Sequence, residues 1–230
     1  SVAFFVGVRR LAKQRCLVQE LPAIEVLARV DVLCADKTGT ITEGSLQVAD
    51  IEHLSGTPEE SVAALTALAH LDPDPNATTL ALRSFLANES DWRITGRIPF
   101  SSARKWSGMS FDGHGNWLLG APENVLGAAY MGDIRIRVET HARDGQRVLV
   151  LATTPFSFSG TETTLAAVEP VALVLLEDVV RADAPDTLRF FAEQGVVVKV
   201  ISGDNNVTVG AVARRAGLDG WEQNVNATTL

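Results

Sequence analysis

The chain has few cysteines and no long apolar run, and both shortages exclude classes of protein. Its 230 residues include only Cys16 and Cys34, too few for a disulfide framework, which indicates a reducing compartment. We expect these two thiols to be free and buried. The longest apolar stretch, Val2–Val8, falls far short of the ~18 residues of a membrane span. It also lacks the pattern of a signal peptide.

The chain also has fewer basic than acidic residues. The chain has 20 Lys and Arg against 28 Asp and Glu, which gives a formal net charge of −8. Because a nucleic-acid binder presents a basic face, we expect no nucleic-acid partner. The hydrophobic fraction of 46% and charged fraction of 21% are those of an ordinary globular protein. The length predicts one large or two modest domains.

The first twenty residues are apolar and then basic. Residues 3–6 are apolar, and four basic residues follow: Arg9, Arg10, Lys13 and Arg15. One interpretation is a helix with a single apolar face. The other is the cytoplasmic end of a membrane helix, since Lys and Arg collect on that side of a membrane. The residues themselves leave both interpretations open.

Two parts of the chain show the pattern of a parallel α/β sheet. A β-prone run ends at Asp36, which predicts this carboxylate at the carboxyl end of a strand, where open α/β sheets place ligands. Further along, apolar runs over 171–176 and 196–201 predict buried parallel strands. Helices are expected over 183–194 and 205–216. This alternation favours a doubly wound sheet with right-handed crossovers.

The middle of the chain has an α+β pattern. A helix is expected from Thr57 to Asp72, with Pro58 in its first turn and Thr57 as its cap. The remaining elements expected here are helices over 78–87 and 133–143 and strands over 92–98, 104–111, 116–119 and 147–153. We therefore predict one α/β domain, split in sequence, with a second domain inserted near residues 49–170.

The strongest chemical signal is Asp36-Lys37-Thr38-Gly39-Thr40. A carboxylate at a strand end can attack a γ-phosphoryl group in line, although a plain surface turn is the simpler alternative. The motif resembles the phosphorylation motif of P-type ATPases, the ion pumps of the haloacid-dehalogenase superfamily. The resemblance implies that Asp36 is the phosphorylated nucleophile, with Lys37 and Thr38 in the catalytic site. It also implies that Mg²⁺ binds Asp36 and the backbone carbonyl of Thr38.

In related phosphatases the position of Thr38 is held by an acid/base Asp. Its loss here should leave the acyl phosphate longer lived, as a pump requires.

Two later stretches resemble motifs of the same family. Asp178-Val-Val-Arg181 is similar to its Asp-Pro-Pro-Arg element at the hinge, with both prolines replaced. Ser202-Gly203-Asp204 is similar to its Thr-Gly-Asp element. The resemblance implies that the Ser202 hydroxyl and the Gly203 amide hold the transferred phosphoryl group, while Asp204 faces the nucleotide and metal. It places Asp178 and Arg181 among the cofactor-binding residues.

The middle block resembles the nucleotide-binding domain of these pumps. Phe100-Ser-Ser-Ala-Arg-Lys105 is similar to its Phe-Ser-x-x-Arg-Lys stretch, which implies that Phe100 stacks on adenine and Lys105 lines the pocket. Gly120 begins a Gly-Ala-Pro-Glu match, and Arg147 matches an arginine that reaches the phosphates. The alternative for Phe100 is a core aromatic beside Pro99.

This block also departs from the family. The lysine that precedes Gly-Ala-Pro-Glu in the family is Leu119 here, which bears on the affinity for ATP. The Thr-Glu-Thr element of some relatives aligns with Asn76-Ala77-Thr78, so its glutamate is absent as well.

The sequence therefore predicts an incomplete, Rossmann-like haloacid-dehalogenase phosphorylation domain, residues 1–48 and 171–230, with an inserted α+β nucleotide-binding domain, residues 49–170. Residues near 49 and 171 would form the hinge. The resemblance implies the cytoplasmic part of an integral membrane pump that forms an aspartyl-phosphate from MgATP to drive cation transport. Its partners would be ATP, the rest of the pump polypeptide, and a cation bound by membrane helices outside this chain.

Several functional points stay open at this stage. The alternatives are a haloacid-dehalogenase-type phosphatase with a cap domain and a non-catalytic nucleotide-binding module. The heavy-metal signature Ser-Glu-His-Pro is not found, which disfavours copper- and zinc-type transport. The family resemblance implies calcium or another hard cation instead. The family's later phosphate-binding lysine and Gly-Asp-Gly-x-Asn-Asp loop are also not found. We therefore expect these 230 residues alone to bind ATP weakly and not to turn it over.

Overall fold

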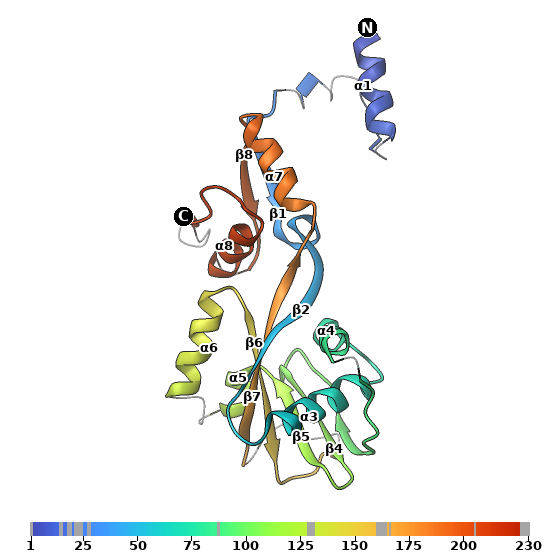
Figure 1. Ribbon diagram of the computed structural model, residues 1–230, viewed down its shortest axis with the longest axis vertical. Helices are drawn as coiled ribbons and strands as arrows, with labels where there is room; N and C mark the ends of the chain where they lie inside the picture. The colour runs from blue at the N-terminus through green and yellow to red at the C-terminus, as the bar shows by residue number, and fades with distance from the viewer. Residues whose placement is uncertain are drawn as a thin grey trace.

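The computed structural model describes residues 2–13, 16–17, 20, 25–26, 29–86, 88–127, 132–159, 165, 167–204 and 206–225. Figure 1 shows its elements. The helices are α1 (Val2–Lys13), α3 (Pro58–His70), α4 (Ala77–Phe85), α5 (Pro122–Leu126), α6 (Asp133–Arg143), α7 (Ala184–Glu193) and α8 (Asn206–Arg215). The strands are β1 (Val32–Asp36), β2 (Thr42–His53), β3 (Ile94–Ile98), β4 (Trp106–Phe111), β5 (Gly115–Gly120), β6 (Arg147–Thr154), β7 (Glu169–Val180) and β8 (Val197–Ile201).

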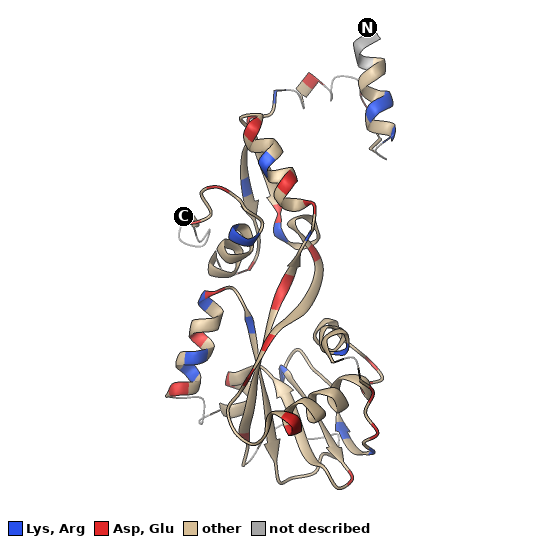
Figure 2. Cartoon of the chain, in the orientation of Figure 1, with Lys and Arg blue, Asp and Glu red and all other residues tan. Residues whose placement is uncertain are grey.

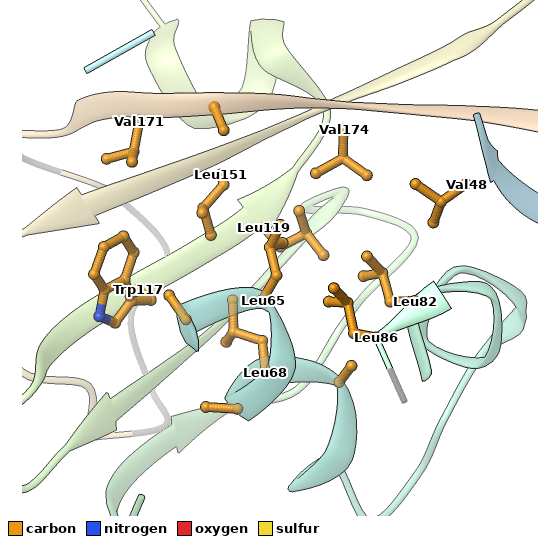
Figure 3. Packing of buried hydrophobic residues seen from close by; sticks show 14 of the residues in the cluster. Val48, Leu65, Leu68, Leu82, Leu86, Trp117, Leu119, Leu151, Val171 and Val174 are labelled. Atoms are coloured by element: carbon orange, nitrogen blue, oxygen red, sulfur yellow. The ribbon is translucent and has the colours of Figure 1, made fainter. Parts of the chain in front are cut away.

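The larger lobe is built on a six-stranded antiparallel sheet in the order β2-β7-β6-β5-β4-β3. Helices α3 and α4 cover one face. Figure 3 shows Leu65 and Leu82 of these helices packed against Leu119 and Leu151 of the sheet. The alternation of side chains along each strand sends its other residues to the opposite face. There, Leu118 and Val150 pack with residues of α5 and α6 in a second core.

Helix α6 packs on the sheet through the half-buried Ile134 and Val138, and hydrogen bonds from its polar face add to that contact. None of its residues is buried, and Figure 2 shows acidic and basic residues alternating along it. Arg137 Nη1 lies 2.7 Å from Glu52 Oε1 of β2, and His141 Nε2 lies 2.8 Å from the other oxygen of the same carboxylate. Glu52 therefore fixes the position of α6 over the sheet.

The smaller lobe contains a two-stranded parallel sheet, β1-β8, with Asp36 opposite Ile201. Helices α7 and α8 pack on one face of it through Leu188 and Val212, in a third core with Val198 and Val200. The residues that alternate with these point the other way. Their apolar members are exposed: Val32, Val197 and Ile201. In the part of the chain that the structure describes, helices therefore cover one face of this parallel sheet and leave the other face exposed.

Strands β2 and β7 join the two lobes as one antiparallel ribbon (Figure 1). The two strands pair along nearly their whole length, from Thr42 opposite Val180 to His53 opposite Ala172. The expectation of a parallel strand over 171–176 is therefore wrong. Its continuous apolar run arises because both faces of β7 are covered by helices, which gives the same pattern as burial in a parallel sheet. The pairing register shifts between Thr42 and Leu46 and again between Val48 and Asp50.

Most of the remaining expected elements lie within a few residues of their predicted bounds. Helix α6 matches its predicted bounds, and Thr57 caps α3 by accepting a hydrogen bond from the Glu60 amide at 3.2 Å. The expected strand over 92–98 begins only at Ile94. Residues 87 and 205, at the ends of two expected helices, lie outside the described residues.

The expectation of buried thiols is wrong, because Cys16 and Cys34 are both free and exposed. Cys34 lies on the uncovered face of β1, where no helix shields it.

At the N-terminus, residues 2–13 form helix α1, whereas Arg15 of the basic group lies outside the described residues. Among the helices of the described residues, none is both long enough and apolar enough to cross a membrane.

Candidate functional site

Asp36 ends β1 as an exposed residue. Its pairing partner Ile201 ends β8, so Lys37 and Ser202 leave the same edge of the parallel sheet side by side. The chain then turns tightly at Gly39, whose φ of 75° is in the left-handed region that glycine adopts freely. Thr42 closes the turn, because its hydroxyl donates to the Lys37 carbonyl at 3.3 Å.

The side chain of Lys37 connects all three motifs of this lobe. Its Nζ lies 2.6 Å from Asp178 Oδ2 and 2.5 Å from Asp204 Oδ2. The lysine is 2% exposed, so its charge is compensated by these two carboxylates rather than by water. Burial is the largest single influence and lowers the pKa of Lys37. The hydrogen bonds and charges of the two aspartates together outweigh it and raise the pKa above its ordinary 10.5.

The loop after β8 is open to a ligand. The Ser202 hydroxyl accepts a hydrogen bond from the Asp204 amide at 3.2 Å. A Cβ added at Gly203 would meet nothing within 4 Å, so the protein's own packing does not require glycine there. The absence of a side chain leaves room for a group to approach the Gly203 amide.

Arg181 does not reach the other two motifs. Its Nε donates to Asp183 Oδ1 at 3.1 Å, and this hydrogen bond is the main cause of a pKa of Asp183 below its usual value. The Arg181 amide donates to the Ile41 carbonyl at 3.0 Å, which ties the end of β7 to the turn after Asp36.

Sequence reasoning missed Arg215. It pairs with Glu177 and lies with its Nη2 3.4 Å from the Asp178 carbonyl. The sequence around Arg215 contains no motif that predicts these contacts, because Glu177 and Asp178 lie more than 30 positions away in the chain.

In the larger lobe, a cavity of about 660 Å³ is lined by four of the six residues assigned to cofactor binding, namely Phe100, Lys105, Gly120 and Arg147. Asp178 and Arg181, the other two, do not line it. Phe100 is 49% exposed, so the alternative of a core aromatic is wrong. A cavity lined by an exposed ring and two cations is suited to a nucleotide, because the ring can stack on a base and the cations can neutralise phosphates.

The wall of this cavity is formed where β4 begins and β5 ends. Lys105 has a φ of 60°, unusual for a residue with a side chain, and its carbonyl accepts a hydrogen bond from the Ala121 amide at 3.0 Å. A Cβ at Gly120 would lie 2.3 Å from Trp106 Cβ and 2.6 Å from the Lys105 oxygen. Only glycine fits at this crossing, because any side chain would clash with Trp106 and the Lys105 backbone.

Both places where the chain departs from the family lie on the cavity wall: Leu119 stands for the lysine, and Ala77, which follows Asn76, stands for the glutamate. Leu119 lines the cavity and is 9% exposed, with its side chain in the core below α3 and α4 (Figure 3). Asn76 lines it from the start of α4, which it caps by accepting a hydrogen bond from the Thr79 amide at 3.0 Å.

The donor set suits a metal that is shared with a ligand. Among the described residues, no group of three or more His, Cys, Asp or Glu could hold an ion alone. Asp36 and Thr38 offer an exposed carboxylate and a backbone carbonyl. Mg²⁺ keeps several waters and shares phosphate oxygens with its ligands, so two protein oxygens fit it.

The chain belongs to the haloacid dehalogenase-like hydrolases, whose family model matches residues 30–229. It is further similar to cation-transporting ATPases, which confirms the resemblance to the P-type class. It is 50% identical over 229 residues to the calcium-transporting ATPase CtpE of Mycobacterium tuberculosis, covering 99% of this chain. It is 36% identical over 232 residues to the probable cation-transporting ATPase exp7 of Streptococcus pneumoniae, again over 99% of this chain.

The chain spans less than a third of the length of these relatives, 28% and 29% respectively. Among solved structures, it is similar to the crystal structure of a zinc-transporting PIB-type ATPase, with a TM-score of 0.73 and 21% identity. That match covers 94% of this chain and 33% of the other. It confirms the α/β fold with its second lobe as that of P-type ATPases.

Proposed function

We propose that this chain is the nucleotide-binding and phosphorylated part of a cation-transporting P-type ATPase, on the cytoplasmic side of a membrane. The observation that carries the proposal is the position of Asp36. It is exposed at the carboxyl end of β1, beside the 202–204 loop, and its neighbour Lys37 joins Asp178 to Asp204. Residues 1–48 and 171–230 would form the phosphorylation domain and residues 49–170 the nucleotide-binding domain.

In this proposal the reaction is a phosphoryl transfer to a carboxylate. An oxygen of Asp36 forms a bond to the γ-phosphorus of ATP while the bond from that phosphorus to the bridging oxygen breaks, and ADP leaves with the electron pair. Ser202 and Gly203 donate hydrogen bonds to the transferred group. Mg²⁺ at Asp36 and Thr38 would neutralise phosphate charge. Lys37 holds the loops of the site at fixed positions.

The cavity of the larger lobe would deliver the nucleotide. Phe100 stacks on the base, and Lys105 and Arg147 neutralise phosphates. Since the relative that is 50% identical is named a calcium-transporting ATPase, we propose calcium as the transported cation.

Nucleotide binding is tested on this chain by NMR titration with MgATP. We expect weak binding, with a Kd on the order of 1 mM. Phe100→Ala should weaken it at least ~5-fold, because stacking is worth about 1–3 kcal/mol per base. Phe156→Ala is the matched control, since Phe156 is also exposed (58%) and does not line the cavity. Equal loss in both variants would refute the assignment of the cavity.

Phosphorylation is tested in a chimera in which this chain replaces the matching segment of the M. tuberculosis relative. We expect an acid-stable, hydroxylamine-labile phosphoenzyme that Asp36→Asn abolishes and Asp31→Asn, a nearby exposed aspartate, retains. The 230-residue chain alone should form no stable phosphoenzyme. Rapid hydrolysis of p-nitrophenyl phosphate by that chain would favour the phosphatase alternative instead.

A further inference from the structure

Arg215, in the last turn of α8, holds two consecutive residues of β7. Its Nη1 pairs with Glu177 Oε2, and its Nη2 lies 3.4 Å from the Asp178 carbonyl oxygen. The side chain of Arg215 is only 25% exposed and that of Glu177 20%, so water screens this ion pair less than it screens a pair on the open surface. The planar guanidinium suits two acceptors at once. Arg215 therefore ties the end of α8 to β7, at the residue that also binds Lys37.

The beginning of α8 is tied to the same strand by a second set of contacts. Residues 202–204 lead into this helix, and Asp204 Oδ2 lies 2.5 Å from Lys37 Nζ, which in turn lies 2.6 Å from Asp178 Oδ2. Asp178 is thus joined to α8 twice, by its carboxylate through Lys37 and Asp204 and by its carbonyl through Arg215. Because packed helices shift as units, the anchor at the end of α8 also determines where the 202–204 loop lies.

The partner of Arg215 is itself held in place. Glu177 Oε1 accepts a hydrogen bond from Gln47 Nε2 of β2 at 2.7 Å, across the ribbon. Both carboxylate oxygens are therefore occupied, one toward β2 and one toward α8. Within the described residues, Arg215 forms no hydrogen bond or ion pair with Asp36 or with the 202–204 loop. Any effect of Arg215 on the chemistry must therefore act through the position of other groups.

We propose that Arg215 is a positioning residue of the phosphorylation site, which anchors α8 to β7 and so holds the 202–204 loop beside Asp36. This inference rests on the proposed function, in which that loop binds the transferred phosphoryl group. A displacement of about 1 Å in a reacting group can cost ~100-fold in rate. Neither Arg215 nor Glu177 lines the cavity of the larger lobe, so loss of the anchor should slow phosphoryl transfer and leave nucleotide binding unchanged.

The first experiment measures the initial rate of phosphoenzyme formation in the chimera as a function of MgATP concentration. We expect Arg215→Met to lower the rate at saturating MgATP by about 10- to 100-fold, while the concentration at half-maximal rate changes less than ~2-fold. Arg214→Met is the matched control, because this neighbouring arginine is exposed and its guanidinium lies over the ring of Trp221 instead. It should leave both values unchanged.

The conservative variant separates the ion pair from mere bulk. Lys keeps a charge that can pair with Glu177, but it lacks the planar fork that also reaches the Asp178 carbonyl. We expect Arg215→Lys to react at least ~5-fold faster than Arg215→Met and more slowly than the wild type. If Arg215→Lys is no faster than Arg215→Met, the ion pair does not carry the effect and the inference is overturned.

NMR spectra of this chain report the position of the loop directly. In Arg215→Met the amide signals of Gly203 and Asp204 should shift, whereas a titration with MgATP should still give the wild-type Kd. Loss of dispersed signals throughout the chain, or weaker MgATP binding in step with the slower rate, would mean that Arg215 stabilises the fold in general. Either result would contradict a positioning role.

The outcomes for the two proposals are distinct. If the wild-type chimera forms no phosphoenzyme that Asp36→Asn abolishes, the proposed function fails, and this inference with it. If the wild type is phosphorylated on Asp36 and Arg215→Met reacts at the wild-type rate, the inference is wrong while the proposed function stands.

Discussion

At the scale of single residues, Lys37 is a buried charge whose two partners come from segments far away in the chain. Removing its ammonium leaves Asp178 and Asp204 facing each other without a cation. We expect Lys37→Met to lower the free energy of unfolding by about 1–3 kcal/mol, since the half-buried Asp178 loses its cation while water still solvates the more exposed Asp204. The measurement is urea denaturation. The exposed Lys199→Met on β8 serves as the control and should change stability little.

The same lysine predicts a dependence of stability on alkaline pH. Its pKa in the folded chain is raised above its ordinary 10.5, so the stabilisation is fully present below pH 10.5 and is lost as the pH rises through the folded-state value. We expect the midpoint of urea denaturation to fall over that range in the wild type and to fall less in Lys37→Met. Parallel curves for the two proteins would contradict the assignment of this effect to Lys37.

Lys105 combines a functional charge with a strained backbone. Asn adopts positive φ more readily than Lys does and has no charge. We therefore expect Lys105→Asn to keep or slightly raise the free energy of unfolding while it weakens MgATP binding several-fold. Thermal unfolding and NMR titration measure the two effects separately. A loss of both together would mean that the side chain is structural.

At the scale of elements, the sequence predicts the bounds of helices better than it predicts the pairing of strands. The bounds of α6 and the cap of α3 are predictable because charges, a capping threonine and a first-turn proline mark them locally. The pairing of β2 with β7 is not predictable in the same way. Two register shifts interrupt the alternation of β2, and double-sided burial of β7 imitates a parallel strand.

The crossing of β4 and β5 predicts a steric effect at Gly120. Gly120→Ala would place a Cβ 2.3 Å from that of Trp106, so we expect a loss of about 3 kcal/mol in the free energy of unfolding. Nucleotide binding should weaken with it, because the same crossing positions Lys105. Gly203→Ala, where an added Cβ meets nothing, is the steric control for stability in urea denaturation.

At the scale of the whole molecule, the two lobes touch where the turn before β6 meets α8. A Cβ at Gly145 would lie 2.2 Å from Ala211 Cβ, so this contact has no free space. We expect Ala211→Leu to cost about 1–3 kcal/mol and to separate the lobes, which small-angle scattering would detect as a larger radius of gyration. Ala192→Leu, exposed on α7, should leave the radius unchanged.

The sequence yields candidate residues for the site but not the contacts between them. The motifs identified Asp36, Phe100 and Arg147 because each lies in a recognisable local sequence. The ion pairs of Lys37 and Arg215 depend on how distant segments fold together, and no spacing within the chain encodes those contacts.

The ribbon formed by β2 and β7 is continuous from one lobe to the other. A two-stranded ribbon is strongly twisted, and each irregularity in its register bends the strand and increases the twist locally. A rotation of the larger lobe about the long axis of the ribbon would therefore first have to open the close contact between Gly145 and Ala211.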